Sequence, residues 1–333
     1  MRFGLALPHY DFSLRDARPI RFARTAEWAA RAEQTGFDSV WVSDHFFYSL
    51  ARYGLGDDLL GSLEPMTVLA ALARMTSRVR LGTLVLGVPF RHPAILAKSA
   101  TAIDLLSGGR LDLGLGAGWY EEEFVRFGYP FGTLGERFSR LEETVAALDA
   151  LLAGGPVTFQ GEYVRFAQAY DHPRPIQQPR PPIWIGAKGG DRALRLAVRH
   201  ADGWNTVWRW TVDAYAERVR RARELCEELG RDPATFRLSI GLYSVIGEDE
   251  RDLAARWEAM RAWAPGAAVD PLETFVADTL SGTVEQVAER IAELAELGVE
   301  EIVVSAATLP FAIPDPAMLD ILTDTVMPDA RAG

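Results

Sequence analysis

Residues 110–123 read Arg-Leu-Asp-Leu-Gly-Leu-Gly-Ala-Gly-Trp-Tyr-Glu-Glu-Glu, and this stretch decides how the rest of the chain is interpreted. Leu111, Leu113 and Leu115 occupy alternate positions, which predicts a strand. Glycines at 114, 116 and 118 remove side chains from the end of that strand. Bare backbone there has two interpretations, and both stay open at this point. Either a flat or bulky ligand approaches it, or the glycines relieve crowding inside a barrel.

Strand-like segments recur along the whole chain, and most are followed by a helical pattern. Eight can be recognised, at 2–7, 39–43, 79–86, 111–116, 183–186, 203–207, 236–246 and 301–305. Two longer stretches interrupt the alternation, 120–181 after the fourth strand and 248–280 after the seventh. This order predicts a (β/α)8 TIM barrel with two insertions, forming a single domain over residues 1–333.

An open, doubly wound sheet is the alternative architecture, because the Gly-x-Gly-x-Gly at 114–118 superficially suits a dinucleotide. Two features argue against it. The glycines lie deep in the chain instead of in a first strand-to-helix turn, and no clear acidic strand end follows about 20 residues later. We therefore expect a closed barrel.

The composition is that of an ordinary globular protein, with 48% hydrophobic and 24% charged residues. The formal net charge of −11 argues against nucleic acid or an anionic membrane as a partner, because phosphates would be repelled. The single cysteine, Cys226, can form no internal disulfide. We see no signal peptide and no apolar run of the ~18–20 residues that a membrane span needs. We expect a cytoplasmic protein whose partner is a small-molecule substrate.

In a barrel, ligands bind where the strands end, so the residues just beyond each strand are the candidates for a site. These positions hold His9, Asp44, His45, Asn205 and the segments 83–87, 117–119 and 187–190. The set contains histidines, one lysine, aromatic rings and bare backbone, but no metal-ligand spacing. It also lacks a Gly-x-Ser-x-Gly nucleophile turn. We therefore expect neither metal-assisted nor serine-dependent hydrolysis, and no metal.

Lys188, Gly189 and Gly190 lie between the fifth strand and a helix that begins near residue 191. The first N–H groups of a helix are unpaired and point outward. A glycine turn with one positive side chain at this place is typical of a phosphate site. The alternative is an ordinary strand-to-helix turn, and we favour the phosphate.

Several motifs follow one another in order between about residue 3 and residue 305. They include Gly-Phe-Asp-Ser-Val-Trp-Val-Ser-Asp-His-Phe at 36–46, Arg-His-Pro at 91–93, Ser-Gly-Gly-Arg-Leu-Asp-Leu-Gly-Leu-Gly-Ala-Gly-Trp at 107–119, Pro-Pro-Ile-Trp-Ile-Gly at 181–186 and Ala-Asp-Gly-Trp-Asn at 201–205. Together they resemble the luciferase-like flavin and deazaflavin monooxygenase and reductase superfamily. The resemblance is closest to the branch that uses coenzyme F420, an 8-hydroxy-5-deazaflavin.

The resemblance implies a (β/α)8 barrel with the deazaflavin ring lying over the strand ends. The residues implied as cofactor contacts are Asp44, Leu84, Val85, Gly87, Gly118, Trp119, Gly186, Lys188, Gly189 and Gly190. A non-proline cis peptide between Leu84 and Val85 would support one face of the ring. The turn that contains Lys188 would hold the phosphate.

The resemblance also bears on the substrate. The sugar-phosphate dehydrogenase branch has a glutamate directly after its Gly-x-Gly, where this chain has Trp119. An indole there favours an apolar or aromatic substrate near the ring. Glu121, Glu122 and Glu123 suit the start of a helix, and one of them can still reach the site.

The implied reaction is hydride transfer between F420 and a small organic substrate, with His45, Asp44 and His9 as candidate catalytic residues. His45 is the first candidate for moving a proton, because imidazole titrates near neutrality, and His9 is the second. The nearest alternative is the same fold with FMN and oxygen, a monooxygenase. A more distant alternative is a barrel that binds a flavin without turnover. The family is often dimeric, which allows a homodimer, although the sequence itself indicates no interface.

Overall fold

Parallel strands close into one barrel in the computed structural model, which describes residues 1–332 apart from the side chains of Arg52 and Ala332. The barrel is closed because β7 pairs with both β5 and β10. In order round the barrel, the strands are β1 (Arg2–Ala6), β2 (Ser39–Val42), β5 (Arg80–Thr83) continued by β6 (Leu86–Gly87), β7 (Leu111–Gly116), β10 (Ile183–Gly186), β11 (Gly203–Trp208), β12 (Arg237–Tyr243) and β15 (Val299–Ser305). The predicted TIM barrel is confirmed, and the open sheet is excluded. A single domain over 1–333 stays a prediction, and Gly333 lies outside the described residues.

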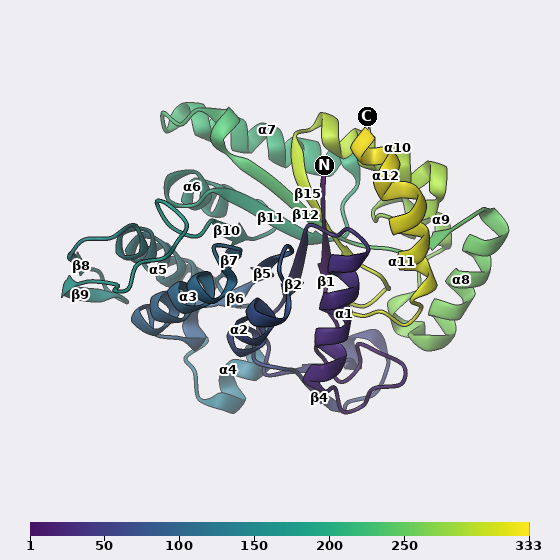
Figure 1. Ribbon diagram of the computed structural model, residues 1–333, viewed down its shortest axis with the longest axis horizontal. Coiled ribbons are helices and arrows are strands. Elements are labelled where there is room, and N and C mark those ends of the chain that lie inside the picture. Colours follow the sequence, from purple (N-terminus) through teal and green to yellow (C-terminus); the bar gives the residue numbers. More distant parts are fainter. Residues whose placement is uncertain (333) are drawn as a thin grey trace.

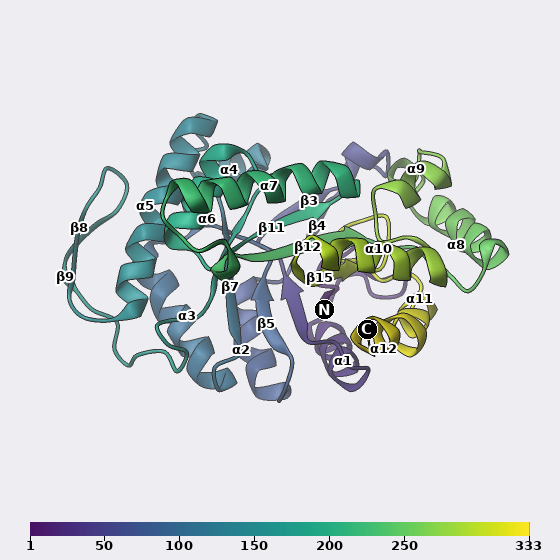
Figure 2. The same cartoon turned by 90° about the horizontal axis from the view of Figure 1, so that it is seen from above.

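Helices surround the barrel on all sides (Figures 1 and 2). They are α1 (Phe22–Gln34), α2 (Pro65–Met75), α3 (Pro93–Ser107), α5 (Leu134–Ala153), α6 (Asp191–His200), α7 (Val212–Glu228), α10 (Val284–Glu296), and α11 (Ala317–Ile321) with the π turn Leu322–Val326 and α12 (Met327–Ala332). Some of them begin at capping boxes. Thr283 and Gln286 form a capping box at α10, and Thr133 and Glu136 form one at α5.

The remaining elements belong to excursions from the barrel. They are β3 (Phe47–Ser49), β4 (Leu59–Gly61), α4 (Glu121–Phe127), β8 (Val157–Gln160), β9 (Arg165–Ala169), β13 (Ile246–Gly247), α8 (Glu250–Trp263), α9 (Leu272–Ala277), β14 (Gly282–Thr283) and the 3-10 turns η1 (Ala51–Tyr53), η2 (Val88–Phe90), η3 (Pro233–Thr235) and η4 (Pro265–Ala267). The insertions after the fourth and seventh strands are confirmed. Their outermost parts, the β8–β9 hairpin and α8, lie at opposite ends of the molecule (Figures 1 and 2).

Two tryptophans fill the amino-terminal half of the barrel. A Cβ on Gly82 would lie 2.2 Å from the Trp41 ring, and one on Gly203 would lie 2.7 Å from the Trp184 ring, so small residues make room for the indoles. Trp41 donates its indole N–H to Ser39 (2.7 Å), and Trp184 donates to Asp112 (3.2 Å). This end of the barrel is therefore a packed plug, and ligands are left to the opposite end.

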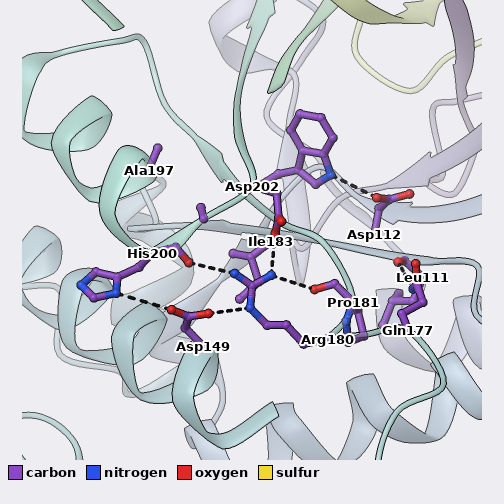
Figure 3. A network of polar contacts seen from close by, with 12 residues as sticks. Leu111, Asp112, Asp149, Gln177, Arg180, Pro181, Ile183, Ala197, His200 and Asp202 are labelled. Carbon is purple, nitrogen blue, oxygen red and sulfur yellow. Dashed lines mark hydrogen bonds and ion pairs between the residues drawn. The ribbon is translucent and has the colours of Figure 1, made fainter. Parts of the chain in front are cut away.

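An arginine network fixes the entry to β10 (Figure 3). Arg180 donates to Asp149 on α5 (2.7 Å) and to Asp202 before β11 (2.5 Å). Asp202 also accepts the backbone N–H of Ile183 (2.8 Å). Buried ion pairs are stabilising only when their remaining lone pairs are satisfied, and here hydrogen bonds to backbone groups do so. The network fixes the start of β10 relative to α5 and β11, and thus the position of the turn that follows β10.

The third barrel strand is interrupted where a single strand over 79–86 was predicted. The peptide between Leu84 and Val85 is cis and separates β5 from β6, which confirms the implied cis bond. We call this break in the strand, at Leu84 and Val85, the bulge. The Val85 side chain occupies the space that three glycines leave open. An added Cβ would come within 2.9 Å of it at Gly114, 2.7 Å at Gly116 and 2.5 Å at Gly186. Gly114 and Gly116 therefore relieve crowding inside the barrel, which is the second of the two interpretations of the glycine-rich strand.

We expect Gly114→Ala to lower the free energy of unfolding by about 1–3 kcal/mol, because overpacking forces backbone to move. The new Cβ would lie 2.0 Å from the Thr83 carbonyl oxygen. Urea unfolding followed by circular dichroism measures the change. Gly135→Ala is the matched control, since its nearest neighbour is 3.7 Å away and alanine favours a helix. Equal stabilities of the two variants would contradict this account of the bulge.

Candidate functional site

The carboxyl rim, meaning the residues that directly follow the barrel strands, collects the predicted site residues. They are His9 after β1, Asp44 and His45 after β2, Leu84 to Gly87 around the interruption, Gly118 and Trp119 after β7, Gly186 at the end of β10, and Lys188 to Gly190 just beyond it. The short helix α4 and the β3–β4 hairpin lie on this side, at the bottom of Figure 1. Within the described residues, no group of three or more His, Cys, Asp or Glu side chains is arranged to hold a metal ion.

Two loops seal one arc of the rim. The turns η1 and η4, which we call the strap, touch so closely that a Cβ on Gly266 would lie 1.3 Å from the Tyr53 carbonyl oxygen. Beneath them, Tyr10 after β1 and Phe311 after β15 belong to the same buried apolar cluster. On the other arc, from His45 through Val85 and Trp119 to Lys188, side chains keep exposed surface, so this arc is the candidate ligand site.

His9 lies on the sealed arc and is fully buried. Its Nδ1 lies 2.8 Å from the Leu7 carbonyl, which can only accept, and its Nε2 accepts the Ser43 N–H at 3.2 Å. Burial lowers the pKa of His9 from 6.5 to about 4, against the smaller opposing effect of these backbone hydrogen bonds. His9 is thus buried and neutral in this structure, and its catalytic role stays a prediction.

Both carboxylate oxygens of the buried Asp44 are occupied by hydrogen bonds within the protein. Both carboxylate oxygens accept from the Arg91 guanidinium, one at 3.0 Å, and Oδ2 accepts the Gly87 N–H at 2.9 Å. Burial is the largest single influence on the pKa of Arg91 and lowers it. The hydrogen bonds and charges of Asp44 and Glu64 together outweigh burial, so the pKa is raised above its ordinary value. The Asp44 carboxylate joins the end of β2 to the segment that carries the bulge, and its catalytic role stays a prediction.

His45 has a buried carboxylate partner that the sequence did not single out. Its Nδ1 lies 2.7 Å from Oε2 of Glu123, while Oε1 of Glu123 accepts the Phe46 N–H at 2.5 Å. A carboxylate only accepts, so Nδ1 carries the hydrogen, and no hydrogen bond is described for Nε2. The carboxylates at 121–123 do begin a helix, α4, as expected. Only Glu123 turns inward, beside Phe124, whose ring would lie 2.6 Å from a Cβ on Gly118.

The turn after β10 has the parts of a phosphate site. Gly190 precedes α6 without a side-chain cap, and Gly189 has φ +74, with its bare Cα facing Trp204. Lys188 donates to the Val207 carbonyl and lies 5.1 Å from the centroid of the Trp210 ring. Desolvation lowers its pKa, and the charge of Asp278 opposes that effect. Uncapped helix N–H groups beside an ammonium group fit an anionic oxygen cluster.

This architecture can be compared with known proteins. The sequence profile of the luciferase-like monooxygenase family matches residues 1–301. The chain belongs to this family.

Several proteins similar to this luciferase-like chain are named as F420-dependent enzymes. An F420-dependent glucose-6-phosphate dehydrogenase of Kineococcus radiotolerans is 35% identical over 80% of this chain and 78% of its own. An F420-dependent hydroxymycolic acid dehydrogenase of Mycobacterium tuberculosis is 32% identical over 80% of this chain and 69% of its own. A coenzyme F420-dependent tetrahydromethanopterin reductase from Methanopyrus kandleri has the same fold, with a TM-score of 0.76, 23% identity and coverage of 98% and 99% of the two chains. These similarities support an oxidoreductase. Among the described residues of this family member, no helix is long and apolar enough to cross a membrane.

The buried His9 predicts how the stability of this luciferase-like protein depends on pH. Its folded pKa of about 4 lies below the ordinary 6.5, so the unfolded chain binds more protons between these values. The stability from neutral His9 is complete above pH 6.5 and is lost as the pH falls toward 4. From pH 5 to pH 7, the free energy of unfolding should rise by about 2 kcal/mol more in the wild type than in His9→Asn.

Urea unfolding at the two pH values tests this difference. Asparagine can still donate to the Leu7 carbonyl, and all other titrating groups are shared, so the difference isolates His9. Parallel pH dependences in the two proteins would show that His9 is not held neutral by burial.

Proposed function

We propose that this luciferase-like family member is a coenzyme F420-dependent oxidoreductase, which transfers a hydride between the deazaflavin and a small organic substrate. The observation that carries the proposal is the open arc of the rim. It joins an uncapped helix start and Lys188 to the bare backbone around Val85. The relatives named as F420-dependent support this cofactor over FMN. A cytoplasmic location and a homodimer stay predictions.

The residues of the arc divide the tasks between them. The bound deazaflavin would supply the hydride-transfer chemistry. Lys188, Gly189, Gly190 and the first N–H groups of α6 would hold its phosphate. Val85 and Gly87 would support the ring, since Val85 keeps partly exposed surface and Gly87 is fixed through Asp44. Gly186 has no side chain and so leaves room for Val85. It would therefore contribute to cofactor binding only by allowing Val85 to pack in place.

His45 is the proposed proton carrier. Its side chain keeps 14% of its surface exposed, and its described hydrogen bond uses Nδ1, so Nε2 is the atom that faces a substrate. Glu123 would act as a positioning residue, because it fixes the tautomer and the ring orientation. The pair is anchored by backbone donors, so it does not need a cofactor to form.

The substrate that we propose is apolar or aromatic. Trp119 is 52% exposed, and its ring meets the His45 ring edge-on, with centroids 5.6 Å apart. Tyr120 stacks on Trp119 at 5.4 Å. Such a surface offers ring faces and few charges beside the proposed proton carrier.

Cofactor binding gives the first test. The purified protein should bind F420, detected by titration of ring fluorescence, more tightly than FMN. Lys188→Met should weaken F420 binding about ten- to hundred-fold, because a charge-assisted hydrogen bond contributes roughly 1.5–3 kcal/mol. Lys98→Met is the matched control. Lys98 lies on α3, its side chain is half exposed, and it pairs with Asp171 instead of with a residue of the arc. Tighter binding of FMN would favour a monooxygenase, and binding of neither would overturn the proposal.

Turnover gives the second test, with reduction of F420 followed by absorbance over a panel of aromatic and aliphatic alcohols. His45→Asn should lower kcat about 10²-fold or more, as expected for loss of a general acid–base group. Glu123→Gln should lower kcat and alter its pH profile while leaving F420 affinity unchanged. Glu121→Gln is the control, since that carboxylate lies in the same first turn of α4 and is exposed. Full turnover of His45→Asn with bound cofactor would end the acid–base assignment.

A further inference from the structure

A surface cavity of about 250 Å³ lies outside the site described above. None of the predicted cofactor contacts lines it. It is enclosed by η2 and the start of α3, by Tyr129 after α4, by one side of α5, and by the tip of the β8–β9 hairpin. It is therefore built from the insertion after the fourth strand and from the segment that follows the bulge.

The walls of the cavity are aromatic and firmly held. Phe90 and Tyr129 meet edge-on, with centroids 5.3 Å apart. Tyr163 lines the hairpin side, and Glu143 on α5 fixes it by accepting its backbone N–H at 2.7 Å and that of Val164 at 3.0 Å. Ring faces and edges held in this way favour a flat ligand.

The charged side chains that line the cavity are arginines. Arg91, His92 and Arg140 line it, and none of the described lining residues is acidic. Arg91 is already paired with Asp44 and Glu64. Arg140 differs, because no ion pair or hydrogen bond is described for its half-buried side chain. Its guanidinium lies 5.1 Å from the centroid of the Tyr163 ring. A guanidinium without a carboxylate, beside an aromatic face, is a receptor for a planar anion.

We propose that this cavity binds a small aromatic carboxylate, a single ring that carries one carboxylate group. The fork of the Arg140 guanidinium matches the two oxygens of a carboxylate, and the ring would lie against Phe90, Tyr129 and Tyr163. The proposal goes beyond the proposed function and requires neither the cofactor nor the reaction, so either one can fail without the other.

Benzoate is the probe, and isothermal titration of the full chain without added cofactor is the measurement. Benzoate should bind at least about ten-fold more tightly than benzyl alcohol, which lacks the charge, and than acetate, which lacks the ring. Arg140→Gln should weaken benzoate binding about ten-fold. Tyr163→Leu, which keeps an apolar side chain, should weaken it several-fold and gives a second variant if the first proves unstable.

Two controls locate the binding. Arg199→Gln, on the exposed side of α6, and Lys188→Met should both leave benzoate affinity unchanged. Loss of affinity in Lys188→Met would place benzoate on the carboxyl rim and overturn the proposal. Unchanged affinity in Arg140→Gln would overturn it as well. Inorganic phosphate or acetate binding as tightly as benzoate would reduce the cavity to a simple anion site.

Discussion

The side chain of Val85 fills the space of three missing Cβ atoms, and the accessible part of the carboxyl rim depends on that exchange. Gly114, Gly116 and Gly186 come from two neighbouring strands and give way to one side chain from a third. Asp44 then fixes the segment beyond the bulge through Arg91 and the Gly87 N–H. Protein interiors are close-packed, so no one of these residues can grow without moving the others. The surface on which we propose that the ring lies is therefore set by packing before any ligand arrives.

The strap gives the rim its asymmetry. A barrel has eight strand ends, but the contact between η1 and η4 covers those of β1 and β15. The two rim histidines consequently differ although both follow adjacent strands. His9 has both ring nitrogens satisfied by the backbone and is buried, whereas His45 keeps one nitrogen toward the open arc. Position at a strand end makes a residue a candidate, and burial by distant loops decides whether a substrate can touch it.

The barrel and most of its helices could be predicted because their signals are local. Alternating leucines mark β7, and Thr283 with Gln286 marks the start of α10. The cis bond at Leu84 came from the family resemblance, as no local rule predicts it. What could not be predicted are partners distant in sequence. Arg91 lies 47 residues from Asp44, and Glu123 lies 78 residues from His45. Neither pairing leaves a trace in spacing or periodicity.

Glu123 is the residue whose burial most needs a reason. A carboxylate taken out of water costs several kcal/mol unless donors surround it, and replacing such a group by an apolar side chain often leaves stability unchanged. Here a short helix of seven residues turns one of its three acidic side chains inward, while Phe124 beside it supplies the apolar packing. Phe124 alone would have served to dock the helix on Gly118. The carboxylate adds hydrogen bonds to the backbone at Phe46 and a fixed orientation for the His45 ring, and the second of these is what the proposed proton transfer requires.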